Sequence, residues 1–119
     1  MKPPAYIAGS FSDRPRLRGI RDELAEMGID VIARWLDAPE DGDLAEWAAV
    51  CLNDVDAAHT LILFADVPST AGGYWTELGY AYGCGTPVIG VGPKTNLFCC
   101  FADYWYPAWP ELRADLEKT

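Results

Sequence analysis

One carboxylate stands out by its position in the sequence. Glu77 lies in the stretch STAGGYWTELGYAYG, residues 69–83, where a Gly-rich loop leads from an apolar segment into a predicted helix. The first turns of a helix carry spare N–H groups and partial positive charge, which favour an ionised acid. An ionised, fixed carboxylate can act as a nucleophile at a sugar carbon that develops oxocarbenium character. Acids are also common in first helical turns for the dipole interaction alone, so spacing leaves both interpretations open.

The loop before Glu77 has the composition of an anion-binding turn. Ser69 and Thr70 supply hydroxyl groups, and Gly72 and Gly73 allow the backbone to approach a ligand closely. The same residues also suit an ordinary helix cap followed by a turn. They form neither a Walker motif nor the G-x-G-x-x-G pattern of dinucleotide sites.

A second candidate anion contact follows the first predicted strand. Gly9, Ser10 and Phe11 lead from that strand into a helix, and four arginines crowd the next residues. Arg14 is nearest to the loop and is the preferred phosphate ligand. The other three, especially Arg18 and Arg21, also fit a solvated helix face. Tyr6, within the strand, could hydrogen-bond a carboxylate or simply pack in the core.

The pattern of apolar segments predicts the elements that position these residues. Apolar strands are expected at 5–10, 29–35, 59–66 and 86–92, with a further short strand near 99–102. Helices are expected between them, and the helix at 43–58 has an apolar stripe. The members of that stripe are Leu44, Trp47, Ala48, Cys51 and Val55.

This alternation predicts a single α/β domain over residues 1–119, doubly wound and flavodoxin-like, with a four- to five-stranded parallel sheet. Ligands of such sheets bind beyond the carboxyl ends of the strands, where the strand order reverses. The residues after the strands are therefore site candidates. They include Asn96, which follows the strand predicted at 86–92.

Composition excludes several classes of partner. The formal net charge of −9 argues against nucleic acid polymers and anionic membranes, although a small anion in a local basic pocket remains compatible. Four cysteines without a CxxC pair and one histidine predict neither a metal site nor a redox cofactor. The start MKPPAYIAGSF does not resemble a secretory signal, so we expect a cytoplasmic protein.

Several of these segments together resemble the nucleoside 2-deoxyribosyltransferase family, which includes 2'-deoxynucleoside 5'-phosphate N-hydrolases and phage-type relatives. The resemblance spans about residues 5–98 and rests on four short motifs. They are YIAGSF at 6–11, LILFAD at 61–66, TELGYA at 76–81 and GTPVI at 85–89.

The resemblance implies cleavage of the N-glycosidic bond of a nucleoside or its 5'-monophosphate. Glu77 would attack C1' of the sugar, Tyr6 would orient Glu77, and a second base or water would resolve the intermediate. Ser69 resembles the serine that holds a 5'-phosphate in the hydrolase branch, and residues 9–14 resemble the loop that assists it. Members of the family are homo-oligomers, dimers or larger, and they need no cofactor.

The sequence departs from this family at two acidic positions. Cys51 stands where the family usually has an aspartate, eight residues before the third strand, and Asp54 lies one helical turn later as a possible substitute. Ala71 stands where the transferase branch carries an acid. These departures leave two further interpretations open. One is a catalytically impaired nucleotide-binding or sensing module, and the other is an interaction protein whose exposed aromatic residues mark an interface.

Overall fold

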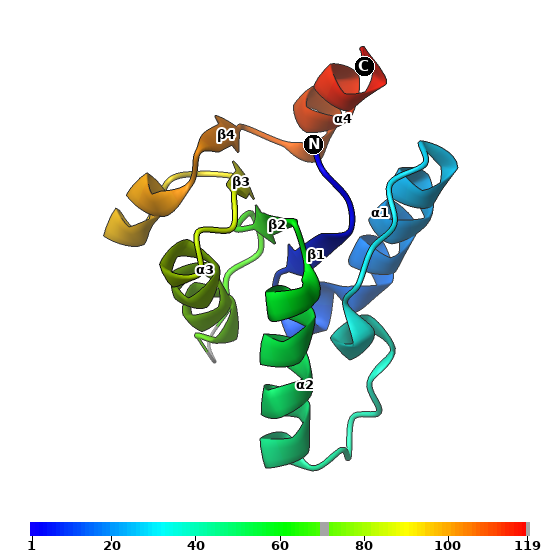
Figure 1. The fold of residues 1–119 in the computed structure, drawn as a ribbon, viewed down its shortest axis with the longest axis vertical. Coiled ribbons are helices and arrows are strands. Elements are labelled where there is room, and N and C mark those ends of the chain that lie inside the picture. Colours follow the sequence, from blue (N-terminus) through cyan, green and yellow to red (C-terminus); the bar gives the residue numbers. More distant parts are fainter. Residues whose placement is uncertain (70–71, 119) are drawn as a thin grey trace.

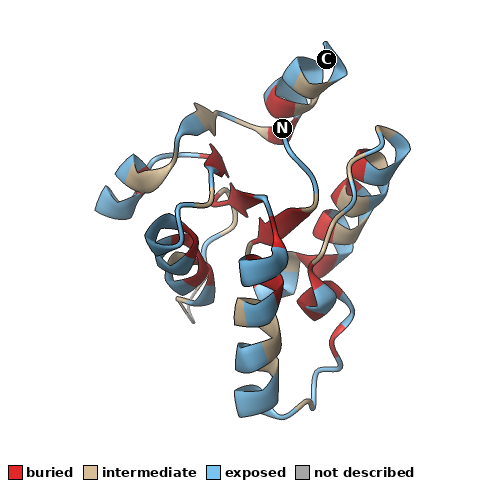
Figure 2. Cartoon of the chain, viewed as in Figure 1, coloured by how far each residue is buried: buried red, intermediate tan, exposed pale blue. Residues whose placement is uncertain are grey.

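Short apolar segments form one parallel sheet in the computed structural model, which describes residues 1–69 and 72–118. The strands are β1 (Ala5–Ala8), β2 (Thr60–Phe64), β3 (Val88–Val91) and β4 (Tyr104–Tyr106), in that spatial order. Every residue of β1, β2 and β3 is buried, as expected for parallel strands that are covered on both faces. The sheet therefore forms the centre of the hydrophobic core (Figure 2).

Helices cover both faces of this sheet. They are α1 (Arg14–Glu26), α2 (Leu44–Ala57), α3 (Gly73–Gly83) and α4 (Trp109–Glu117). Figure 1 shows α2 and α3 side by side on one face, and α1 and α4 on the other. The predicted doubly wound, flavodoxin-like fold with a four- to five-stranded parallel sheet is confirmed.

The strand predicted at 29–35 is wrong for most of its length. Val31 makes a single parallel bridge to Ala5, and the chain then turns into a short 3₁₀ helix, η2 (Arg34–Asp37). Two hydrogen bonds hold residues 34 and 35 in a backbone conformation that is not extended. The indole N–H of Trp35 donates to the carbonyl of Ile7 at 2.8 Å, and the Arg34 N–H donates to the Asp54 carboxylate at 2.9 Å.

The bridge at Val31 still fixes the topology. Val31 pairs with one edge of β1, and β2 pairs with the opposite edge. After β1 the chain therefore passes first to one side of this strand and then crosses to the other side to form β2. This reversal between β1 and β2 is the switch point at which open α/β sheets bind ligands. The loops at the carboxyl ends of these strands therefore frame the candidate site.

The further strand predicted near 99–102 is also wrong. Residues Leu97–Phe101 form a 3₁₀ helix, η3, which begins where the Asn96 side chain accepts a hydrogen bond from the Phe98 N–H at 2.9 Å. Pairing with β3 starts only at Asp103, whose carboxylate accepts from the Val88 N–H at 2.8 Å. The edge strand β4 follows directly.

Gly92 ends β3 in a conformation that only glycine adopts readily, with φ of +117°. A Cβ there would lie 2.6 Å from the backbone nitrogen of Asp66. We expect Gly92→Ala to lower the free energy of unfolding by about 2–4 kcal/mol, because left-handed strain and a backbone clash act together. Urea unfolding measures the change.

Gly79→Ala is the matched control. Gly79 lies within α3, and a Cβ there would meet nothing within 4 Å. Replacing an unstrained helical glycine by alanine raises stability by about 0.5–1 kcal/mol. Equal unfolding midpoints for the two variants would contradict the account of Gly92.

Candidate functional site

The side chains of Tyr6 and Glu77 meet beneath the switch point. Tyr6 comes from β1 and is completely buried, and Glu77 comes from the second turn of α3 and is 9% exposed. The Tyr6 hydroxyl donates a hydrogen bond to Oε2 of Glu77. The two residues singled out from the sequence as nucleophile and orienting group therefore lie in direct contact.

Cys51 of α2 completes the cluster. It is half-buried and lines the same cleft as Glu77. The sequence-based candidates did not include Cys51, because it falls on the apolar stripe of its helix. The signal that could have identified it is its place at the position where the resembled family has an aspartate.

Burial sets the protonation of this cluster. It raises the pKa of Glu77 to about 7, although the hydrogen bond from Tyr6 acts in the opposite direction. Burial and the nearby Glu77 charge raise the pKa of Cys51 to about 11, and the same two causes raise the pKa of Tyr6. Near neutral pH, Glu77 is thus close to its midpoint while the hydroxyl and the thiol both stay protonated.

A cleft of about 720 Å³ opens onto Glu77. One wall is the exposed first half of α2, the opposite wall is the start of α3, and residues 35–42 close one end. The lining is mostly apolar and includes two tryptophans, which suit a planar ring. The apolar lining residues on α2 and in the adjoining loop are Trp35, Ala38, Pro39, Leu44, Trp47, Ala48 and Leu52.

A second cavity of about 760 Å³ has a different, polar character. Two arginines and three serines line it, and it shares Phe11, Glu40 and Ser69 with the apolar cleft. The two cavities are therefore neighbours. The charged and hydroxyl lining residues of the second cavity are Ser10, Ser12, Arg14, Arg18, Glu40 and Ser69.

Arg14 is built into the wall of this polar cavity and is 8% exposed. Its Nε donates to the Phe11 carbonyl at 3.3 Å, Nη1 donates to the Ala38 carbonyl, and the guanidinium lies 3.7 Å from the centre of the Phe11 ring. The nearest acid is Glu40, 3.9 Å from Nη2, and its side chain is 88% exposed. The Arg14 guanidinium is held in place by these contacts, and the Glu40 carboxylate beside it is exposed to solvent. Arg14 is therefore well placed to bind an anion.

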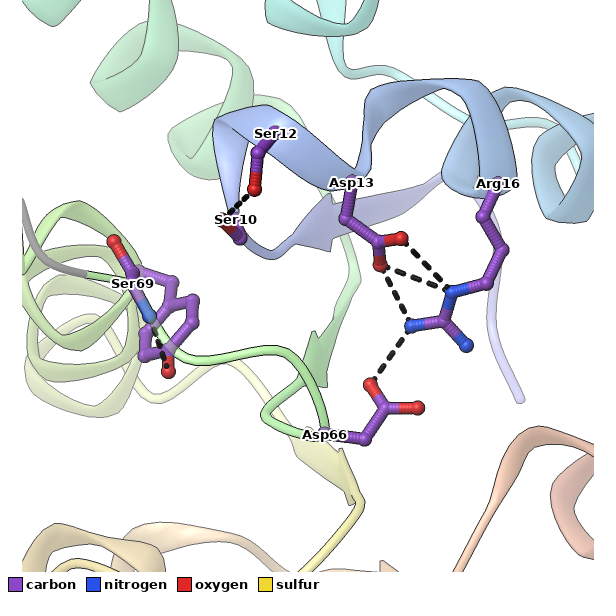
Figure 3. A network of polar contacts seen from close by, with 7 residues as sticks. Ser10, Ser12, Asp13, Arg16, Asp66 and Ser69 are labelled. Carbon is purple, nitrogen blue, oxygen red and sulfur yellow. Dashed lines mark hydrogen bonds and ion pairs between the residues drawn. The ribbon is translucent and has the colours of Figure 1, made fainter.

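The loops around this cavity are tied together by polar contacts (Figure 3). Arg16 bridges Asp13 and Asp66, with nitrogen–oxygen distances of 2.7 and 2.8 Å, and so joins α1 to the loop after β2. The hydroxyls of Ser10 and Ser12 lie 2.9 Å apart. The Ser69 N–H donates to the Tyr74 hydroxyl at 3.2 Å, and Ser69 lines both cavities.

Other predicted binding residues gather at the same place. Gly9 and Gly73 line the apolar cleft together with Phe11. A Cβ on Gly9 would lie 2.7 Å from Leu17, so α1 packs closely against the end of β1. Gly72 precedes α3 with φ of +72°. Thr70 lies outside the described residues.

Two predicted site residues lie away from this cluster. The Asp54 carboxylate is 1% exposed and holds Arg34, with Oδ1 at 2.8 Å from Nη2 and Oδ2 at 2.9 Å from the Arg34 N–H. Its contacts therefore fix η2 against α2. Asn96 caps η3 at the end of the chain segment after β3. Among the described residues, neither belongs to the lining of the two cavities.

Within residues 1–69 and 72–118, no group of three His, Cys, Asp or Glu side chains is placed to hold a metal ion. Over the same residues, the helices are too short or too polar to cross a membrane.

No protein-family model and no curated protein sequence matches the chain. The solved structures that share its fold include the following three. A conserved protein from Enterococcus faecalis V583 has a TM-score of 0.78 at 16% identity, with 96% of each chain covered. A 2-deoxyribosyltransferase from Bacillus psychrosaccharolyticus has a TM-score of 0.74 at 20% identity, with 94% of each chain covered. The Clostridium botulinum CMP N-glycosidase BcmB has a TM-score of 0.64 at 15% identity, with 97% of each chain covered.

One of these three structures is a 2-deoxyribosyltransferase and another is a CMP N-glycosidase, in agreement with the resemblance seen in the sequence motifs. At identities of 15–20%, the likeness establishes the fold of the chain. What the site does must be argued from its own residues.

Proposed function

We propose that this protein cleaves the N-glycosidic bond of a (deoxy)nucleoside 5'-monophosphate, with Glu77 as the nucleophile. The observation that carries the proposal is the place of this buried carboxylate. Glu77 receives a hydrogen bond from Tyr6 and faces an apolar cleft that adjoins a cavity lined by arginine and serine. A base in the cleft and a phosphate in the polar cavity would leave the sugar between them, beside Glu77.

The reaction has two displacements at C1' of the sugar. A Glu77 oxygen forms a bond to C1', and the base leaves with the electron pair of the C–N bond and takes a proton from solvent. Water or a second base then attacks C1', and Glu77 leaves as a carboxylate. Tyr6 keeps its proton throughout and holds Glu77 in place, because its raised pKa makes the phenolate unfavourable.

The polar cavity favours a phosphorylated substrate. A 5'-phosphate carries about 1.5 to 2 negative charges near neutral pH and offers three acceptor oxygens. Arg14 and Arg18 supply cationic donors, and Ser10, Ser12 and Ser69 supply hydroxyls. The solvated Glu40 side chain can leave Arg14 when the phosphate enters, since that ion pair is long and exposed.

The second candidate is a nucleotide-binding module without turnover. The observation that favours it is the engagement of Asp54 by Arg34, because this acid is then held away from a leaving base. A carboxylic acid near the base would speed departure by protonation. Binding without release of free base is the result that this candidate predicts.

Incubation with a panel of nucleosides and 5'-monophosphates, with and without a free acceptor base, tests the proposal. Chromatography resolves released and exchanged bases. Free base from monophosphates without an acceptor is the result expected of a hydrolase, and exchange only with an acceptor indicates a transferase. Absence of turnover on every substrate, together with measurable nucleotide binding, would replace the proposal by the binding module.

The pH dependence of the reaction is a separate prediction. Only ionised Glu77 is a nucleophile, and its pKa is raised to about 7, so kcat/KM falls as the pH drops below about 7 and levels off above it. Tyr6→Phe removes a hydrogen bond that lowers this pKa, so the acidic limb of the profile moves to higher pH. Initial rates with a nucleoside substrate avoid the titration of the phosphate itself.

Tyr104→Phe is the control for that measurement, because Tyr104 is 64% exposed on β4. Its profile should match that of the unmodified protein. Two results would contradict the environment assigned to Glu77. One is an acidic limb of the kcat/KM profile at the ordinary pKa of a glutamate, and the other is an acidic limb that does not move in Tyr6→Phe.

The proposal includes a homo-oligomer. Leu44 of α2 is 88% exposed at the rim of the apolar cleft, and Leu97 and Phe98 of η3 are 75% and 43% exposed. Exposed apolar groups of this size are typical of contact surfaces. Light scattering on the purified protein is expected to give a mass of at least two chains, and a monomer at micromolar concentration would contradict it.

A further inference from the structure

Three residues line both the apolar cleft and the polar cavity, and they mark the boundary between the two. They are Phe11, Glu40 and Ser69. A nucleotide with its base in the cleft and its phosphate in the polar cavity has to place its sugar at this boundary. The boundary residues are therefore the ones that can recognise the hydroxyl groups of the sugar.

Glu40 supplies the acceptor that such hydroxyls need. Apart from Glu77, it is the one carboxylate among the described residues that line the two cavities. An ionised carboxylate has two oxygens, and each can accept a hydrogen bond from a hydroxyl. The Glu40 carboxylate lies 3.9 Å from Nη2 of Arg14, which is too far for a hydrogen bond, so its oxygens remain open to a ligand.

The turn that carries Glu40 is held at both ends. At its start, Nη1 of Arg14 donates to the Ala38 carbonyl. At its end, a Cβ on Gly42 would lie 2.4 Å from the indole nitrogen of Trp47, so the backbone packs directly against α2. This fixed backbone places the carboxylate at the boundary before a ligand arrives, which lowers the cost of ordering on binding.

We propose that Glu40 determines the sugar specificity of the site, with its carboxylate accepting hydrogen bonds from the neighbouring 2'- and 3'-hydroxyls of a ribose. The preferred substrate is then a ribonucleoside 5'-monophosphate, because a 2'-deoxy sugar has lost one of the two donors. An acid binds the ribose hydroxyl of dinucleotides in the same way. The inference rests on the proposed function, since it needs a nucleotide that spans the two cavities.

Arg14 connects the sugar contact to the phosphate. A 5'-phosphate on Nη2 of Arg14 replaces Glu40 as the counterion, which frees the Glu40 carboxylate for the sugar. The phosphate and Glu40 are then two negative groups in one site, so removal of Glu40 should strengthen the binding of any 5'-monophosphate. The ratio of ribonucleotide to deoxyribonucleotide affinity is therefore the quantity that isolates the sugar contact.

Isothermal titration calorimetry with AMP and dAMP, and with CMP and dCMP, tests the inference. The measurements use Glu77→Gln, so that no nucleotide is turned over. We expect the ribonucleotide to bind about 5- to 20-fold more tightly than its deoxy counterpart, because the acceptor is charged but solvated. When Glu40→Ala is added, this ratio should fall to about 1, while the deoxyribonucleotide binds more tightly than before.

Asp41→Ala is the matched control. Asp41 is the next residue in the same turn, it is exposed, and it is not among the described residues that line either cavity. Its replacement removes the same charge, but the affinity ratio should stay that of Glu77→Gln alone. Glu40→Gln keeps one acceptor oxygen without the charge, so we expect an intermediate ratio.

The two proposals fail in different ways. A ratio that stays the same when Glu40 is replaced, or deoxyribonucleotides that bind as tightly as ribonucleotides before it is replaced, overturns the role of Glu40, whatever the activity of the protein. A ratio that falls in Glu40→Ala, in a protein that releases no base, supports the role of Glu40 and removes the proposed N-glycosidic activity instead. Failure of all four nucleotides to bind overturns both.

Discussion

Glu77→Gln is expected to reduce base release on the order of a thousandfold or more, because an amide cannot form the glycosyl ester. Glutamine has the shape of glutamate and can still accept a hydrogen bond from the Tyr6 hydroxyl. The cleft is therefore kept while the nucleophile is lost. Single-turnover assays with saturating protein measure the chemical step directly.

Glu111→Gln controls for loss of a negative charge, because Glu111 is an exposed acid in the first turn of α4. Its rate should be that of the unmodified protein. Equal rates for Glu77→Gln and the unmodified protein would contradict the nucleophile assignment. Loss of activity in both variants would point to a general effect of charge.

The stability of Glu77→Gln gives a second readout that does not depend on substrate. The pKa of Glu77 is raised from 4.5 to about 7 by burial, so its ionisation in the folded state costs stability as the pH rises through that range. Between pH 5 and pH 8, the unmodified protein should therefore lose about 2–3 kcal/mol relative to Glu77→Gln. Urea unfolding at the two pH values measures this difference.

Arg14→Gln is expected to lower kcat/KM for a nucleoside 5'-monophosphate by about 10- to 100-fold, because hydrogen bonds to a charged group contribute roughly 1.5–3 kcal/mol. The same substitution should leave kcat/KM for the matching nucleoside nearly unchanged. Arg14→Lys keeps the charge but not the fork of donors, so we expect an intermediate loss. Initial-rate assays on the two substrates give the ratio.

Arg16→Gln is the control for this prediction. Arg16 belongs to the same helix, but its guanidinium is committed to Asp13 and Asp66. Its ratio of monophosphate to nucleoside activity should stay that of the unmodified protein. An equal loss on both substrates in Arg14→Gln would show that Arg14 acts through its contact with the Ala38 carbonyl and not through the phosphate.

Much of the fold could be predicted from local patterns, because the buried strands β1, β2 and β3 are nearly continuous apolar runs. The segment 29–35 has the same apolar character, yet it forms only one bridge. Its course depends on the hydrogen bonds of Trp35 and Arg34 to Ile7 and Asp54. These partners are distant in the sequence, and no local pattern reveals them.

Tyr6 and Glu77 could be predicted from the sequence, because Tyr6 lies in the first apolar strand and Glu77 lies near the start of the helix that follows the Gly-rich loop. The site was not predictable along α2, where the apolar stripe predicted a core contact. Val55 is buried in the core, but Leu44 is exposed and Trp47 lines the cleft. The helix extends beyond the edge of the sheet (Figure 1), so its first half has no sheet to cover. Hydrophobicity alone cannot distinguish a core wall from a cleft wall.

The most direct test of the account is to trap the intermediate. The protein is incubated with a monophosphate that carries fluorine at C2', which slows both displacements, and is then quenched in acid and digested for peptide mass spectrometry. The account predicts a sugar phosphate attached to Glu77, formed as one equivalent of base is released, and absent in Glu77→Gln. Release of base with Glu77 unmodified, or attachment at another residue, would contradict it.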